Sequence, residues 1–131
     1  MDADRIICHN TEAHSDGLVE ICLLGIAFSL WLEMRAVRAL HTSAVVKAGL
    51  VVAFVGGNGD GKSSLAGAMM EAGCPLITDD LLPIRDSHGS FIAYPSCSQM
   101  RLWPEEARFF LGHYESLQKV HPEHEKRKVH I

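Results

Sequence analysis

The segment from Gly56 to Ser63 reads G-G-N-G-D-G-K-S and fits the phosphate-binding pattern G-x-x-x-x-G-K-[ST]. Glycines let the backbone curl so that several N–H groups point at one anion. In this pattern Lys62 reaches the β- and γ-phosphates of a nucleotide, and the Ser63 hydroxyl ligates Mg²⁺. We therefore predict a nucleotide-binding loop; the alternative is a glycine-rich turn without a ligand. The residues expected to contact the nucleotide are Gly56, Gly57, Asn58, Gly59, Asp60, Gly61, Lys62, Ser63 and Ser64.

The segments on either side of the loop have the composition that such a loop requires. Leu50–Val55 is a continuous apolar run, which is typical of a buried strand. Residues 63–72 read as a helix that stops at Gly73, with Pro75 beyond it. In the order strand, loop and helix, the positive end of the helix dipole lies at the phosphate site.

Two adjacent acids, Asp79 and Asp80, are the candidates for the rest of the chemistry. Phosphoryl transfer needs a further Mg²⁺ ligand and a group that receives the proton of the nucleophile. The acids follow a short predicted strand, 76–78, and neighbouring side chains on an extended segment point in opposite directions. One carboxylate is therefore expected to face the metal and the other the substrate hydroxyl. The alternative is that the two acids simply begin a polar turn.

Three further residues each have two interpretations. His41 precedes a predicted hairpin and is either a hydrogen-bonded framework residue or part of the site. Arg101 lies between apolar residues, where it either carries phosphate charge or covers the core with its aliphatic stem. Trp103 is interpreted as a core or interface residue rather than a platform for a nucleotide base.

The helices and strands expected around these residues predict an α/β fold, a mixed sheet that contains parallel strands and has flanking helices. Residues 1–16 are expected to form a loosely ordered N-terminus and residues 17–131 a single domain. The expected helices are 18–40, as one helix or two, 63–72 and 105–111. The expected strands are 43–47, 50–55, 76–78, 81–85 as a continuation, and 91–94, followed by a loop at 95–98. The charged tail from Lys119 onward is expected to be solvated.

Composition limits the classes of partner and compartment. The net charge of −4 and the pI of about 6.0 argue against a nucleic-acid binder that relies on a basic surface. The four cysteines form no C-x-x-C pair, and Asp2 and Asp4 occupy what would be the basic region of a secretory signal. These features predict a cytoplasmic protein with reduced thiols. Ile21–Leu32 has 12 uncharged residues, too few to span a bilayer, and predicts a buried helix, with a membrane-surface helix as the alternative.

One family combines these features. The run H-T-S-A-V-V-K-A-G-L-V-V-A-F-V-G-G-N-G-D-G-K-S, followed by G-C-P-L-I-T-D-D, resembles the HPr serine kinase/phosphorylase family. His41 stands 21 residues before Lys62 and Asp80 stands 18 after it, which resembles the separations of that family's active-site histidine, loop lysine and catalytic aspartate. The run Y-P-S-C-S-Q-M-R-L-W-P-E and the pair Lys126-Arg127 resemble stand-alone HPr-kinase-like proteins, some of which phosphorylate a serine of a lasso-peptide precursor.

The resemblance implies a mixed sheet with flanking helices, as in phosphoenolpyruvate carboxykinase, together with ATP, Mg²⁺ and a serine acceptor. It also implies that Asp80 takes the serine proton, that His41 helps to set the phosphate site, and that Asp79 is a second metal ligand beside Ser63. Homo-oligomers are common in the family, and the apolar Ile21–Leu32 segment agrees with a covered surface.

The chain departs from the HPr enzymes at several positions. Asp60 stands directly before Gly61, whereas the acid of the family's loop comes earlier, and Asn58 stands where a small hydroxyl residue is common. The family's later glutamate metal motif has no counterpart here, and Arg101 and Arg127 are the candidates for its distal arginine. The chain is also short for the subgroup, as a truncated member would be.

The sequence as a whole predicts an ATP- and Mg²⁺-dependent kinase that acts on a serine hydroxyl of a peptide or small protein. Two other classes fit the same residues. One is a nucleotide-binding regulatory module without transferase activity, and the other is a small-molecule kinase or carboxykinase-like enzyme. A third possibility is a structural subunit whose residues 18–32 pack on another chain.

Overall fold

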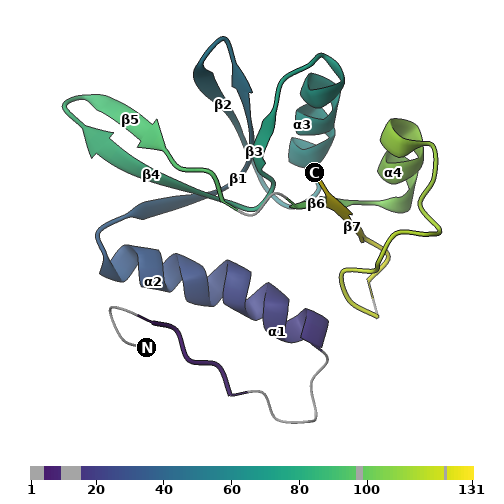
Figure 1. Ribbon diagram of the computed structural model, residues 1–131, viewed down its shortest axis with the longest axis horizontal. Coiled ribbons are helices and arrows are strands. Elements are labelled where there is room, and N and C mark those ends of the chain that lie inside the picture. Colours follow the sequence, from purple (N-terminus) through teal and green to yellow (C-terminus); the bar gives the residue numbers. More distant parts are fainter. Residues whose placement is uncertain (1–4, 10–15, 97–98, 123) are drawn as a thin grey trace.

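The computed structural model describes residues 5–9, 16–96, 99–122 and 124–131 (Figure 1). The helices are α1 (Asp16–Cys22), the π-helical segment η1 (Leu23–Ala27), α2 (Phe28–Met34), α3 (Lys62–Glu71) and α4 (Pro104–Leu111). The strands are β1 (Arg38–Lys47), β2 (Leu50–Val55), β3 (Leu76–Thr78), β4 (Leu81–Ser87), β5 (Ser90–Ala93), β6 (Gln99–Leu102) and β7 (Arg127–His130). This is the predicted mixture of helices and strands. Most of the N-terminus expected to be loose, residues 1–4 and 10–15, and half of the loop expected at 95–98 lie outside the described residues.

The long strand β1 organises the main sheet. It pairs with β2 along one side, and on the other side with β4 through its first half and β3 through its second. β5 adds to β4, which gives the order β2-β1-β4-β5 with β3 beside β1. Every strand pair in the described part of the chain is antiparallel, so the expectation of parallel pairing is wrong.

The shared direction of β2 and β3 nevertheless brings the residues that follow them to the same edge of the sheet. Both strands run antiparallel to β1 from opposite sides of it, and they therefore run in the same direction as each other. The residues that follow β2 and those that follow β3 consequently leave the sheet at the same edge. Thr42 of β1 marks this edge, because it pairs with Val55 and its N–H donates to the Asp80 carbonyl at 2.9 Å.

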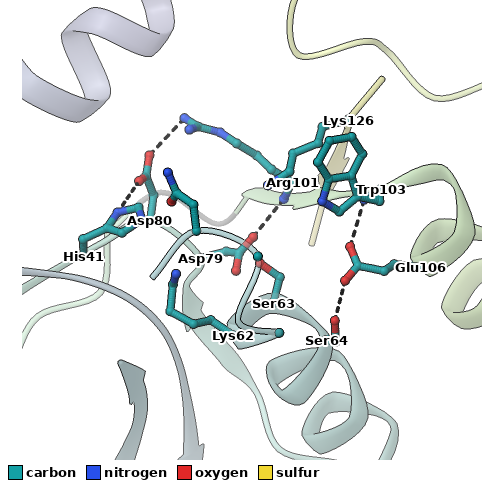
Figure 2. Close-up of a pocket in the computed structure, with 13 residues that line it drawn as sticks. His41, Lys62, Ser63, Ser64, Asp79, Asp80, Arg101, Trp103, Glu106 and Lys126 are labelled. Carbon is teal, nitrogen blue, oxygen red and sulfur yellow. Dashed lines mark hydrogen bonds and ion pairs between the residues drawn. The ribbon is translucent and has the colours of Figure 1, made fainter. Parts of the chain in front are cut away.

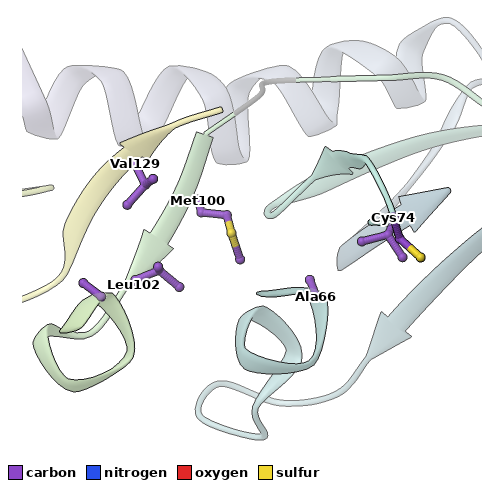
Figure 3. Packing of buried hydrophobic residues seen from close by; sticks show 7 residues of the cluster. Ala66, Cys74, Met100, Leu102 and Val129 are labelled. Carbon is purple, nitrogen blue, oxygen red and sulfur yellow. The ribbon is translucent and has the colours of Figure 1, made fainter. Parts of the chain in front are cut away.

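The hydrophobic core lies between α3, β1 and a second, two-stranded sheet made of β6 and β7 (Figure 3). Its buried members are Val45, Ala66, Cys74, Met100, Leu102, Ala107 and Val129. Gly67 lets α4 pack closely on α3, since a Cβ at that position would lie 2.8 Å from the ring of Phe110. The core thus fixes β6 beside the glycine loop and α3.

The N-terminal helix is continuous from α1 through η1 to α2 and runs along one side of the molecule (Figure 1). The prediction that this helix is buried is wrong. In α2 Leu32 is the buried residue, and η1 has no buried residue. Gly17–Met34, with a mean hydropathy of 1.8, is long and apolar enough to cross a membrane, although core helices and signal sequences pass the same test. The helix ends before Ala36, which has a φ of 55°, and not at Leu40 as predicted. Arg38–His41 form the start of β1 instead, because their backbone pairs with Leu81–Ile84.

Three other strands differ from expectation. β2 lies at the edge of the sheet, and Leu50 and Val55 are 72% and 71% exposed, although their composition predicts a buried strand. No element was predicted for the segment of β6, and the segment of β7 was expected to be a solvated tail, but the two pair with each other, and Arg127 and Lys128 are buried. The hairpin turn at Ala48-Gly49 is confirmed, since Lys47 pairs with Leu50 and both turn residues have positive φ.

Candidate functional site

The glycine loop connects β2 to α3 in the order that the sequence predicts. β2 ends at Val55 and α3 begins at Lys62, with Gly61 as its N-cap. Gly59 and Gly61 have φ values of 88° and 81°, a region that residues with a Cβ rarely enter. These two glycines therefore give the loop a curl that other residues would strain.

Contacts inside the loop hold it in shape without a ligand. The N–H of Gly57 donates to the Asp60 carboxylate at 2.6 Å. Lys62 Nζ donates to the carbonyls of Gly56 at 3.1 Å and Gly57 at 2.7 Å. A Cβ at Gly56 would lie 3.0 Å from the Asp60 carboxylate, which accounts for the glycine there. A bound phosphate would compete with Asp60 for loop N–H groups and with the carbonyls for Lys62.

Asp79 is buried and held by two donors. Ser43 Oγ donates to its Oδ1 at 2.5 Å, and the backbone N–H of Arg101 donates to its Oδ2 at 2.9 Å. Burial raises the pKa of Asp79 above its ordinary 3.8, outweighing the lowering effects of these two donors, the Ser63 hydroxyl and the positive charge of Lys126. The carboxylate is thus fixed in position and aimed at the start of α3.

Asp80 faces the other way and is more accessible. Its Oδ1 lies 3.2 Å from His41 Nδ1 and its Oδ2 lies 3.0 Å from an Arg101 guanidinium nitrogen (Figure 2). The two neighbouring carboxylates thus have different side-chain partners, although both residues line the same cavity. Arg101 links them, because its backbone holds Asp79 and its side chain holds Asp80.

A cavity of about 350 Å³ joins the loop to the acids, a volume within the range of small-molecule sites. Its lining residues are His41, Asn58, Gly59, Gly61, Lys62, Ser63, Ser64, Asp79, Asp80, Arg101, Trp103, Glu106 and Lys126. Gly56, Gly57 and Asp60, which were also predicted to bind nucleotide, lie in the loop but do not line this cavity. Lys62 and Asp80, the two residues on which the predicted chemistry depends, face the same space.

Three lining residues had no assigned part in the predicted site. Glu106 accepts the N–H of Trp103 at 2.9 Å in a capping box at the start of α4, and it also accepts the Ser64 hydroxyl. The acids Glu105 and Glu106 after Pro104 mark the start of a helix in the sequence, and this pattern could have predicted that Glu106 caps α4. Lys126 Nζ lies 5.2 Å from the centre of the Trp103 ring, which is half-exposed at the cavity rather than in the core.

Arg127, one of the two candidates for a distal arginine, does not line the cavity. Its guanidinium lies near Glu125 and 5.3 Å from the ring of Tyr114. Consecutive residues of an extended segment face opposite ways, so that Lys126 faces the cavity while Arg127 is buried behind it. Arg101, the other candidate, does line the cavity.

The chemistry of the donors fits Mg²⁺. Ser63 and Asp79 line the same cavity and interact with each other. Mg²⁺ commonly takes one or two protein oxygens, with phosphate oxygens and water completing its octahedron. Within the part of the chain that the structure describes, no three His, Cys, Asp or Glu side chains gather as an all-protein metal site. Ser63 and Asp79 are two oxygen donors of this cavity that could hold Mg²⁺.

Comparison of the chain with protein-family models, with curated proteins and with solved structures gave no match.

Proposed function

We propose that this chain is an ATP- and Mg²⁺-dependent kinase of the HPr-kinase-like type, with a phosphoenolpyruvate-carboxykinase-like site, that phosphorylates a serine hydroxyl of a peptide or small protein. The observation that carries the proposal is the shared cavity. Lys62 at the head of the glycine loop and the Asp80 carboxylate open onto the same 350 Å³ space, as transfer from a nucleotide to an alcohol requires.

The cations of the cavity are suited to hold the triphosphate. Loop N–H groups and the N-terminus of α3 attract the phosphates. In the bound state Lys62 exchanges its two carbonyl partners for phosphate oxygens, and Lys126 approaches from the opposite wall. Negative charge that spreads over the γ-phosphoryl oxygens during transfer is stabilised by these fixed groups.

Asp80 receives the proton. The serine oxygen attacks the γ-phosphorus, the bond from that phosphorus to the β–γ bridging oxygen breaks, and ADP leaves. The hydroxyl proton passes to an Asp80 oxygen, while His41 and Arg101 keep the carboxylate in one orientation. Ser63 and Asp79 would hold Mg²⁺, which supplies charge neutralisation at the β- and γ-phosphates.

A regulatory nucleotide-binding module is the second candidate, and one observation favours it. Both Asp80 oxygens already have side-chain partners, His41 and Arg101, so the acid could serve only to connect β1 to β6. In that case the chain binds MgATP but transfers no phosphate.

The Asp80→Asn variant separates the two candidates. It keeps the shape of the side chain but removes its ability to take a proton. We expect phosphate transfer from γ-labelled ATP to serine peptides to fall by about 10²–10⁴-fold, with MgATP affinity, measured by calorimetry, unchanged.

The control is Asp86→Asn, which alters an exposed acid near the end of β4 that accepts the N–H of Gly89 in the following turn. It should behave as the wild type. Unchanged transfer in Asp80→Asn would remove the base assignment, and MgATP binding without transfer in the wild type would favour the regulatory module.

A further inference from the structure

The N-terminal helix lies over the Asp80–Arg101 pair, on the side away from the glycine loop (Figure 2). Two more cavities, of about 380 and 410 Å³, open between this helix and the sheet. Both include Asp80, Leu81 and Arg101 in their walls. The Asp80 carboxylate is therefore reached from three cavities, of which the phosphate cavity is one.

The larger of the two, which we call the helix groove, shares His41, Asp80 and Arg101 with the phosphate cavity as lining residues. Two helix rows at i, i+4 and i+8 form its other wall: Ile21, Gly25 and Ser29, and Cys22, Ile26 and Leu30. These rows carry no charge. Ile26 and Leu30 are 72% and 51% exposed at the mouth of the groove. An occupant would thus meet an uncharged, mainly apolar wall and reach a carboxylate at the far end.

Gly25 lies in the wall of the helix groove, within the π-helical segment η1. A Cβ added there would meet no atom of the described residues within 4 Å, so the space beside it is open. Glycine inside a helix costs about 1 kcal/mol relative to alanine, and π-helical segments recur at functional sites. A large side chain at this position would therefore have room to extend into the groove.

Because Asp80 lines both cavities, we infer that the helix groove binds the part of the acceptor that flanks its serine, and that these flanking residues are uncharged and apolar. The inference rests on the proposed kinase function, because it assigns the route by which the hydroxyl reaches Asp80. A charged flank would lose hydration against Ile26 and Leu30 without gaining a partner from either helix row. An apolar flank would instead cover the exposed part of this wall.

The first experiment compares peptides. Nine-residue peptides with one central serine and leucine or valine beside it are tested against peptides with aspartate or lysine there, using γ-labelled ATP. We expect apolar flanks to raise kcat/KM by at least about tenfold, as apolar contacts in such pockets do. Equal rates, or a preference for charged flanks, would contradict the inference while leaving the kinase proposal intact.

The second experiment blocks the groove. Gly25→Phe should lower kcat/KM for the leucine-flanked peptide by at least about tenfold, with MgATP affinity unchanged. Gly25→Ala, which adds one carbon, should cause a smaller loss. Glu33→Phe is the matched control, because Glu33 is exposed on the same helix outside the groove and should transfer at the wild-type rate.

The remaining outcomes assign the groove to something else. Full transfer by Gly25→Phe would overturn the inference. A wild-type dimer in light scattering that Gly25→Phe converts to a monomer would identify a second copy as the occupant. Flotation of the wild type with phosphatidylcholine vesicles that Gly25→Phe keeps or strengthens would identify a lipid surface and contradict the inference. Absence of MgATP binding in the wild type would instead reject the proposed function itself.

Discussion

The glycine loop keeps its shape through contacts between residues three to six positions apart, whereas Asp79 is positioned by partners 22 and 36 positions away. These two sides of the cavity, the loop side and the acid side, face each other and would act on the same phosphate. They nevertheless depend on different parts of the fold. The loop side needs only β2 and α3, while the acid side needs β1, the β3–β4 turn and β6.

This difference has an energetic basis. A contact between near neighbours closes a small loop of chain and costs little conformational entropy, and a contact between distant residues costs more. On the acid side, burial of apolar side chains in the core offsets this loss of entropy, because Met100 and Leu102 of β6 pack with Val45 and Ala66. Binding of nucleotide and transfer of phosphate are therefore expected to respond separately to substitution.

The largest effect is expected on the loop side. Lys62→Ala removes the cation that would neutralise the transferring phosphate, and we expect transfer to fall by about 1,000-fold. MgATP affinity should fall as well, because the lysine also contacts the ground state. Thermal unfolding should barely change, since the hydrogen bonds of Lys62 Nζ within the described part of the chain go to loop carbonyls. Wild-type MgATP affinity in this variant would show that the loop does not bind phosphate.

The acid side should respond in transfer alone. Arg101→Met removes the guanidinium from Asp80 and keeps the backbone N–H that Asp79 accepts. We expect kcat to fall by about 100-fold, the loss typical of a misplaced catalytic group, while MgATP affinity changes little. If instead affinity fell as far as kcat, Arg101 would belong to the phosphate site and the two sides would not be separable.

Asp79 tests the acid side through stability. Its pKa is raised in the folded protein, so the folded state binds more protons than the unfolded state once the pH exceeds 3.8. Ionisation of Asp79 therefore lowers the free energy of unfolding as the pH rises from 3.8 through the raised pKa. The destabilisation is complete once the pH exceeds the raised pKa. Asp79→Asn should remove this fall, which urea unfolding at several pH values would measure. A steeper fall in the variant would mean that burial does not dominate at this carboxylate.

The smallest effect is expected at Asp60. Asp60→Asn removes a negative charge that lies against the loop N–H groups. We expect two- to fivefold tighter MgATP binding, about the size of an exposed charge interaction, and a smaller gain at high salt. Weaker binding would instead indicate that the Asp60 carboxylate is needed to shape the loop.

The same division decided what could be predicted from the sequence. The conformation from Gly56 to Ser63 follows from local rules, because the glycine spacing and the flanking strand and helix leave few alternatives. The place of Asp79 and Asp80 directly after the short strand 76–78 was also predictable, since β3 spans Leu76–Thr78. Both features concern residues close together in the chain.

The remainder depends on contacts that spacing does not reveal. Gln99–Leu102 and Arg127–His130 are short segments that become strands only because they pair with each other. The second of them, R-K-V-H, reads as a solvated tail, but Lys128 pairs with Glu20 of α1. Arg38–His41 likewise lies in β1 rather than in a helix because Leu81–Ile84 offers it a partner. No local pattern distinguishes Lys126, which faces the cavity, from Arg127.

The pairing of β6 with β7 has a consequence for motion. Native proteins open in parts, each at a free energy set by the contacts that it breaks. If β7 parts from β6, Arg101 loses its strand partner Lys128, while β2, the glycine loop and α3 need not move. A nucleotide could then stay bound through a fluctuation that interrupts the chemistry, and the final strand of the described chain would govern how often the site is competent.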